Sequence, residues 1–200
     1  MKHIFKQGAE DGHTLLLLHG TGGNEHDLLS LASIIDPSAN ILSIRGNVLE
    51  NGMPRFFRRL AEGVFDEEDL KFRTKELYDF IGEASKTYSF NNEKVIAAGY
   101  SNGANIAASI LFHYSNPFAG AILHHPMVPL RGMKLPNLTG VPVFIGAGSN
   151  DPICTPQETN ELEQHLTEAG ADVHVHWEQQ GHQLTGTEAE AAAEWYKKIF

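Results

Sequence analysis

The sequence predicts an α/β domain with a mostly parallel central sheet and helices on both faces. Short apolar, β-branched runs alternate along the chain with longer segments whose apolar residues recur at helical spacing. The short runs are apolar almost throughout, which is the pattern of strands that are buried on both faces of a sheet. The chain has 200 residues, of which 42% are hydrophobic. This length suits one domain that spans residues 1–200 and buries a sizeable core.

Strands and helices alternate through the first half of the chain. The expected order is a strand at residues 14–18, a helix at 25–35, a strand at 41–44 and a helix at 68–88. The first helix has leucine and isoleucine at helical spacing and ends at Asp36-Pro37, because proline cannot continue a helix. The second is long and has one apolar face. Between them, residues 47–66 show no clear period.

The second half continues the same alternation. It predicts strands at residues 94–98, 119–123, 141–147 and 173–177, and helices at 104–111, 155–169 and 188–199. The 155–169 helix has Thr155 as its expected cap, Pro156 in its first turn and Gly170 at its end. No segment is long enough for a separate lid domain. Active sites of such sheets lie at the carboxyl ends of the strands, where every motif described below falls.

The strongest motif is Gly99-Tyr100-Ser101-Asn102-Gly103, which reads G-x-S-x-G between an expected strand and an expected helix. A serine on such a turn adopts a strained backbone, and its neighbours two residues away must lack a side chain to avoid collision. The turn lifts the hydroxyl above the sheet at a helix N-terminus, where partial positive charge favours a developing anion. This context favours a nucleophile over a chance match.

A serine nucleophile needs a histidine base, and the histidine needs a carboxylate that fixes its tautomer. In hydrolases with this turn the chain order is serine, acid, histidine. Asp151 follows the apolar strand at 141–147 and is therefore the predicted acid. The alternative is a turn aspartate that caps a neighbouring amide. Asp172 is a weaker candidate because it begins a strand rather than following one. Glu178 is the second choice for the acid after Asp151.

The chain has 11 histidines, and His182 is the predicted base. It lies between the last strand and the last helix, and Gly181 before it lets the loop turn the imidazole back over the sheet. His174 and His176 share one face of a strand, where a polar outer surface is the simpler interpretation. The segment His124-His125-Pro126 follows a strand, and its histidines either line the cleft or pack within a loop.

Acyl transfer passes through a tetrahedral oxyanion, which needs hydrogen-bond donors that are fixed before it forms. One predicted donor is the backbone N–H of Asn102, directly after the nucleophile. The other is the backbone N–H of Thr21, in the glycine-rich segment His19-Gly20-Thr21-Gly22-Gly23-Asn24 that follows the first strand. That segment lacks the lysine of a phosphate-binding loop. A plain turn is the alternative interpretation.

Together these motifs resemble the α/β-hydrolase fold. More narrowly, they resemble the small, lidless phospholipase/carboxylesterase family, which includes acyl-protein thioesterases and many bacterial carboxylesterases. The resemblance covers roughly residues 15–184, and residues 45–59 are similar to a bacterial branch in which some members are linked to hydroquinone or catechol stress. Acyl-protein thioesterases usually have Gly-Phe-Ser-Gln-Gly-Gly at the turn, whereas Tyr100, Asn102 and Ala104 stand here. This departure weighs against protein thioesters as substrates.

The combined interpretation is a serine carboxylesterase that hydrolyses short or accessible esters with Ser101, His182 and Asp151. A thioesterase or lysophospholipase with the same residues is the alternative. A non-catalytic binding protein with this fold is a third hypothesis, but it predicts a broken triad. The machinery implies no cofactor and a small-molecule ester as partner. The resemblance is also compatible with a homodimer.

Residues 47–66 leave the carboxyl end of a strand and should lie beside Ser101. We expect Phe56, Phe57 and Arg58 to contact substrate, the phenylalanines as an apolar wall and the arginine with an anionic group. Arg55, Arg59 and Phe65 are further candidates. The alternative is that the phenylalanines belong to the core and the arginines are solvated or paired.

Composition limits the remaining function classes. The formal net charge is −10, with 25 acidic and 15 basic side chains, which disfavours nucleic acid and anionic membranes as partners. The single cysteine, Cys154, excludes an internal disulfide and suits a reducing compartment. No stretch has the length of a signal-peptide core or a membrane span, so we expect a cytoplasmic protein. No metal site is predicted, because no further ligands accompany the His-x-His pair at 174–176.

Overall fold

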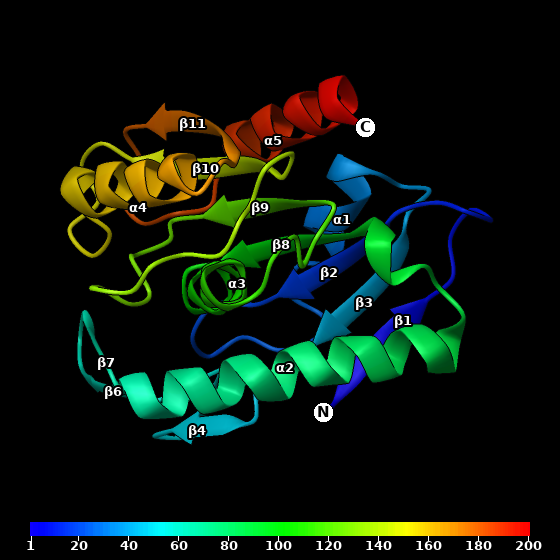
Figure 1. The fold of residues 1–200 in the computed structure, drawn as a ribbon, viewed down its shortest axis with the longest axis horizontal. Helices are drawn as coiled ribbons and strands as arrows, with labels where there is room; N and C mark the ends of the chain where they lie inside the picture. Colours follow the sequence, from blue (N-terminus) through cyan, green and yellow to red (C-terminus); the bar gives the residue numbers. More distant parts are fainter.

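A computed structural model describes residues 1–200, and its centre is a seven-stranded sheet (Figure 1). Only β1 is antiparallel to its neighbour, β3, and every other pair is parallel. The predicted mostly parallel sheet is therefore confirmed. From one edge to the other the strands are β1 (His3–Lys6), β3 (Asn40–Ile44), β2 (Thr14–Leu18), β8 (Val95–Tyr100), β9 (Gly120–His124), β10 (Pro142–Gly148) and β11 (Asp172–Glu178).

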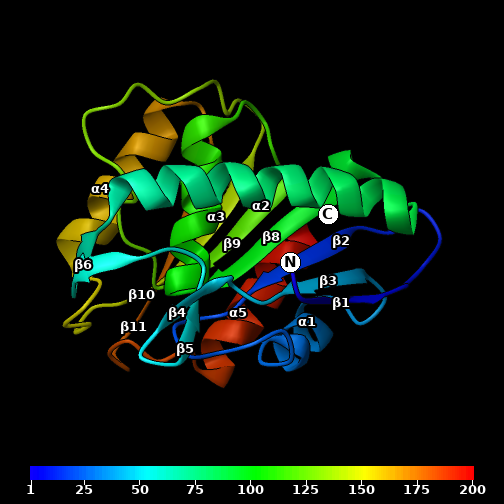
Figure 2. The ribbon, with the colours of Figure 1, turned by 90° about the horizontal axis from the view of Figure 1, so that it is seen from below.

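Helices cover both faces of the sheet, as predicted (Figures 1 and 2). One face packs against α1 (Leu29–Ile35) and α5 (Gly186–Ile199), which also contact each other. The opposite face packs against α2 (Glu67–Tyr88), α3 (Asn102–His113) and α4 (Pro156–Glu168). None of these helices combines the length and the apolarity that crossing a lipid bilayer would require.

The central strand β2 shows why four of its five residues are leucine. All five of its residues are buried. Successive side chains of a strand point to opposite faces, so Leu15 and Leu17 join the core beneath α1 and α5. Leu16 and Leu18 join the larger core beneath α2 and α3. A strand with a core on each side needs apolar residues at every position.

Two predicted helices illustrate how local polar groups set helix ends. The first helix begins at Leu29, not at residue 25, because Asn24 and Asp27 bind neighbouring backbone N–H groups and hold this stretch in turns. The helix α4 has the predicted cap, since the Thr155 side chain accepts from the backbone N–H of Glu158. Gly170 follows its end with a φ of +98°, which glycine adopts without strain.

Residues 47–66, which show no period in the sequence, form two small hairpins. The first pairs β4 (Val48–Glu50) with β5 (Met53–Arg55), and the second pairs β6 (Arg59–Ala61) with β7 (Val64–Phe65). Strands this short give too few repeats for a pattern to be recognised. The segment between β9 and β10, residues 125–141, contains no helix or strand. The edge strand β1 and the short 3-10 helix Asn92–Lys94 were also not predicted from the sequence.

Candidate active site

Ser101 occupies the sharp turn between β8 and α3 that its motif predicts. Its backbone has φ +50° and ψ −112°, a strained conformation for a residue with a side chain. A Cβ on Gly99 would lie 2.7 Å from the backbone of Ala104, and a Cβ on Gly103 would lie 1.9 Å from the carbonyl oxygen of Leu18. Gly99 is therefore required by the close packing of the turn against the start of α3, and Gly103 by its packing against the end of β2.

His182 reaches Ser101 from the loop between β11 and α5. Its Nε2 lies 2.9 Å from Ser101 Oγ, and its Nδ1 lies 2.7 Å from Asp151 Oδ2. The loop is fixed by the Tyr100 hydroxyl, which donates to the carbonyl oxygen of His182 at 2.6 Å. Gly181 has a φ of +63° and donates its N–H to Asn150 Oδ1, so the glycine before the histidine does allow the predicted turn.

Asp151 follows β10 and is almost fully buried. Its Oδ1 accepts the backbone N–H groups of Ile153 at 2.8 Å and Cys154 at 2.9 Å, which leaves Oδ2 for His182. Burial alone would raise the pKa of Asp151, but hydrogen bonds from Cys154, His182 and Ile153 lower it below its usual value. Asp151 is thus held as the carboxylate that orients a histidine.

Glu178, the second-ranked candidate for the acid, does not contact His182. Glu178 accepts hydrogen bonds from the hydroxyl groups of Thr185 and Thr187 at the start of α5, and its nearest histidine is His176. Its role is to tie the end of β11 to the first turn of α5.

Thr21 and Asn102, the two residues predicted to supply oxyanion donors, line the same pocket as Ser101 and His182. Thr21 N–H donates to no acceptor in the chain, and Asn102 N–H is the first of α3, where helices leave their N–H groups unpaired. The Thr21 loop is braced by the first hairpin. Gly22 N–H donates to the carbonyl oxygen of Pro54 at 2.9 Å, and Arg55 Nη1 donates to Thr21 Oγ1 at 2.5 Å.

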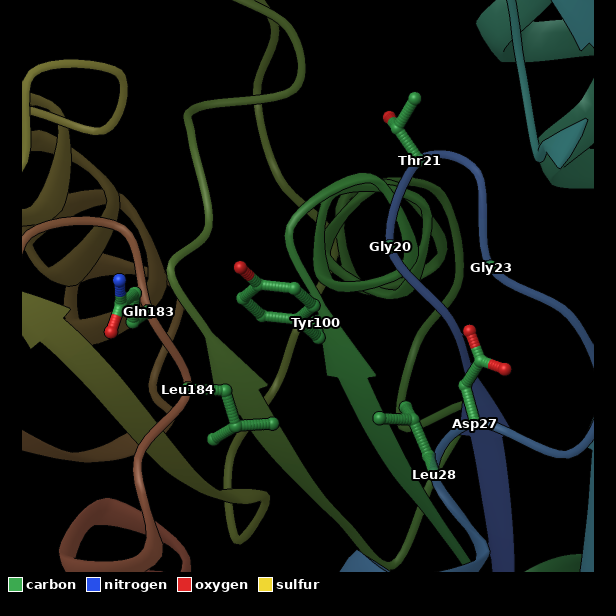
Figure 3. Close-up of a pocket in the computed structure, with 8 residues that line it drawn as sticks. All are labelled: Gly20, Thr21, Gly23, Asp27, Leu28, Tyr100, Gln183 and Leu184. Atoms are coloured by element: carbon green, nitrogen blue, oxygen red, sulfur yellow. The ribbon is translucent and has the colours of Figure 1, made fainter. Parts of the chain in front are cut away.

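The pocket around Ser101 has a volume of about 260 Å³, and Arg55 and Arg59 form part of its wall. A second pocket of about 470 Å³ adjoins it and shares Thr21 and Tyr100 with it. Figure 3 shows the Tyr100 ring between the Gly20–Thr21 segment and the Gln183–Leu184 segment. The space above the sheet is therefore divided by Tyr100 and Thr21 into two adjoining parts.

The predicted substrate contacts of the 47–66 segment need correction. Phe56 and Phe57 are 1% and 0% exposed and belong to the main core, so they do not line the pocket. Arg58 is exposed, is paired with Asp66 and does not line the pocket. The segment does reach the pocket, but through Arg55, Arg59 and Phe65. The register of the short hairpins sets which side chains face Ser101, and the sequence pattern did not reveal that register.

Three buried residues of the site were not singled out as functional by the sequence. His125 contacts Asp151 Oδ2 on one side and Glu188 on the other, and His124 also contacts Glu188. The only signal for the histidines is that they follow a buried strand. Glu188 gave no signal, because an acidic residue in the first turn of a helix is common.

His125, Asp151 and His182 offer three potential metal-ligand atoms within 4.8 Å of one another. Both nitrogens of each ring, however, already contact a hydrogen-bond partner, which is Ser101, Asp151, Glu188 or a carbonyl oxygen. The potential ligand atoms therefore contact one another and their neighbours rather than a common centre. Cys154 is buried beside these residues and donates to the carbonyl oxygen of His125, and burial raises the pKa of its thiol.

The whole chain, residues 1–200, matches the phospholipase/carboxylesterase family. The chain belongs to this family. It is similar to the carboxylesterase of Bacillus cereus, with 64% identity, a TM-score of 0.98 and coverage of 100% of this chain and 95% of that one. It is also 64% identical to MhqD of Bacillus subtilis (strain 168) over 198 residues, or 99% of this chain and 98% of the relative.

A more distant relative of this chain is acyl-protein thioesterase 1 of Cryptococcus neoformans. It is 25% identical over 173 residues, which cover 76% of this chain and 72% of the relative. The resemblance inferred from the motifs is thus confirmed, as is the α/β-hydrolase fold. The protein is a hydrolase of this family.

Proposed function

We propose that this phospholipase/carboxylesterase-family hydrolase is a serine carboxylesterase that works through an acyl-enzyme. The observation that supports it best is the continuous hydrogen-bonded series from Ser101 Oγ through His182 to Asp151, with distances of 2.9 and 2.7 Å. This geometry allows the hydroxyl proton to move to the imidazole as the oxygen attacks a carbonyl carbon.

In the proposed first half-reaction, Ser101 Oγ forms a bond to the ester carbonyl carbon while its proton passes to His182 Nε2. The carbonyl oxygen becomes an oxyanion, which accepts hydrogen bonds from the backbone N–H groups of Thr21 and Asn102. As the tetrahedral intermediate collapses, the bond to the alcohol oxygen breaks and His182 returns the proton to that oxygen. Asp151 keeps Nδ1–H in place throughout and stabilises the imidazolium.

In the second half-reaction, water attacks the acyl group on Ser101 and His182 accepts the water proton. The oxyanion forms at the same two N–H groups, and its collapse releases the acid as Ser101 regains its hydrogen. The products are one carboxylic acid and one alcohol, and the residues return to their starting protonation states.

The first test removes the nucleophile. Ser101→Ala should keep the fold and lower kcat for p-nitrophenyl acetate by at least roughly a thousandfold, because attack by oxygen is lost while the oxyanion donors remain. A fluorophosphonate should add its mass to the wild-type protein at Ser101 and leave the variant unlabelled. Full activity of the variant would refute the assignment, and an unlabelled, inactive wild type would favour a binding protein.

The second test concerns the substrate. Because residues 125–141 contain no helix that could cover the pocket, we propose that the enzyme prefers short or accessible acyl groups. A panel of p-nitrophenyl esters from acetate to palmitate should show kcat/KM greatest among the short chains. A steady rise to palmitate would contradict this preference. Matched acetyl esters and thioesters would reveal the thioesterase alternative, which the similarity to acyl-protein thioesterase 1 supports.

A further inference from the structure

A buried acid–histidine pair lies directly behind the carboxylate of Asp151. His125 follows β9, is 1% exposed and has a left-handed backbone with φ +52°. Its Nδ1 lies 3.0 Å from Asp151 Oδ2, the same oxygen that His182 contacts. Its Nε2 lies 3.0 Å from Glu188 Oε2 and 3.1 Å from the carbonyl oxygen of Gln183.

These contacts determine the protonation of His125. A carbonyl oxygen only accepts, so the contact with Gln183 requires a hydrogen on Nε2. Asp151 Oδ2 already accepts from His182, and Oδ1 accepts two backbone N–H groups, so the carboxylate has no hydrogen to give. Nδ1 of His125 must therefore also donate. An imidazole with hydrogens on both nitrogens carries a positive charge.

Glu188 supplies the matching negative charge from the first turn of α5. It is fully buried, and its two oxygens contact Nδ1 of His124 and Nε2 of His125. Burial alone would raise the pKa of Glu188, but hydrogen bonds from His124 and His125 outweigh it and lower the pKa to about 2. The carboxylate also lies at a helix N-terminus, which favours negative charge.

The fold provides a specific space for this carboxylate. A Cβ on Gly146 of β10 would lie 1.9 Å from Glu188 Oε1 and 3.0 Å from His124 Nδ1. Glycine at this position therefore lets the side chain of Glu188 pass against the strand to reach the two histidines. His124 Nε2, by contrast, is buried without a partner, so this histidine ends the network.

We propose that His125, held as an imidazolium by Glu188, is a positioning residue for the catalytic triad. It donates a second imidazole N–H to Asp151 Oδ2 and so fixes the carboxylate that orients His182. When His182 accepts the proton from Ser101, the charges of the four groups alternate in sign from His182 through the buried Asp151, His125 and Glu188. The proposal rests on the proposed serine hydrolase mechanism.

The charged groups around His125 come from several elements. Asp151 lies after β10, Glu188 in α5, and His182 in the loop before α5, where its ring centre is 5.2 Å from that of His125. Tyr100 of β8 packs edge-on at 6.0 Å, and the thiol of Cys154 donates to the backbone oxygen of His125. Two carboxylates thus contact the ring directly, which favours its cationic form.

The first experiment measures the protonation of His125 itself. Wild-type protein labelled with ¹⁵N-histidine would be examined by NMR at pH 8, and the His125 signals assigned by comparison with His125→Gln. We expect both ring nitrogens of His125 to carry hydrogen at this pH. A neutral ring with one N–H would overturn the proposal, whatever the variants do.

The second experiment removes the charge of Glu188. Glu188→Gln keeps the size of the side chain but replaces one of its two acceptor oxygens with an NH2 donor, and we expect His125 to become neutral at pH 8. We expect kcat for p-nitrophenyl acetate to fall about tenfold with KM within about twofold, as for other groups that orient a catalytic residue. Glu178→Gln is the matched control, because that carboxylate binds the same first turn of α5 without contacting His125 or Asp151.

The outcomes separate positioning from mere loosening of α5. Unchanged kcat in Glu188→Gln, or an equal loss in Glu178→Gln, would overturn the proposal. If Glu188→Gln fails to fold, the wild-type NMR measurement still decides it. If fluorophosphonate fails to label Ser101 in the wild-type protein, the serine mechanism is refuted. The NMR result for the protonation of His125 would still hold in that case, so the two failures can be told apart.

Discussion

At the scale of single residues, the turn that holds Ser101 depends on two residues without side chains as much as on the serine itself. Ser101 has a strained backbone, and Gly99 and Gly103 have no side chain because β2 and α3 lie too close. The sequence predicted these requirements because they are local and follow from the shape of the turn. The strain is maintained by the strand before it and the helix after it.

The first prediction tests this close packing. Gly103→Ala should destabilise the protein by roughly 2 kcal/mol or more and lower activity, because its Cβ would meet the backbone of Leu18 at 1.9 Å. Gly186→Ala is the control, since nothing lies within 4 Å of a Cβ there. Urea unfolding of both variants would measure the effect. Equal stability of the two variants would contradict the packing argument.

The choice of histidine was also a residue-scale problem. The contact of His182 with Ser101 was predictable, because Gly181 and the place of His182 between the last strand and the last helix indicated a loop that turns toward the sheet. His125 was not, because its function depends on Glu188, which is far from it in the sequence. A contact between distant residues leaves no periodic or local pattern in either segment.

At the scale of elements, the hairpin β4–β5 braces the proposed oxyanion site. Pro54 accepts from Gly22 N–H, Arg55 donates to Thr21 Oγ1, and the N–H of Phe56 donates to the Asn102 side chain at 2.7 Å. The hairpin and the residue that follows it thus contact both residues predicted to supply oxyanion donors. The sequence placed residues 47–66 beside Ser101 correctly but predicted substrate contact where the structure shows a structural brace.

The second prediction tests the brace. Arg55→Met keeps most of the length of the side chain and loses its donors, so the Thr21 loop should loosen and kcat should fall about tenfold, less than for complete loss of an oxyanion donor. Arg58→Met is the control, because Arg58 is exposed and paired with Asp66. Kinetics on p-nitrophenyl acetate would measure both. An equal kcat in the two variants would contradict the bracing role of Arg55.

At the scale of the whole molecule, the parallel sheet brings the site together. Ser101, Asp151 and His182 follow β8, β10 and β11, and parallel strands end at the same edge. Asp151, His125 and Glu188 are buried beneath that edge, away from water, so their protonation is coupled to folding. The stability of the molecule should therefore depend on pH through them.

The third prediction concerns that dependence. The pKa of Glu188 is about 2 in the folded protein and near 4.5 when unperturbed, so its contribution to stability is complete above about pH 4.5. The contribution is lost as pH falls toward 2, because the unfolded chain then binds the proton more readily. Urea unfolding from pH 6 to 2.5 should show a shallower loss of stability in Glu188→Gln than in wild type. Parallel curves would contradict this coupling.

The sequence by itself determined the parallel sheet, the serine turn and the order of serine, acid and histidine. Each of these depends on short-range constraints: strand burial, the steric limits of a tight turn, and the places where loops leave strands. Only the tertiary structure decided which side chains of residues 47–66 face the pocket, and that His125 and Glu188 stand behind Asp151. Those features depend on register and on contacts between distant segments, which packing alone fixes.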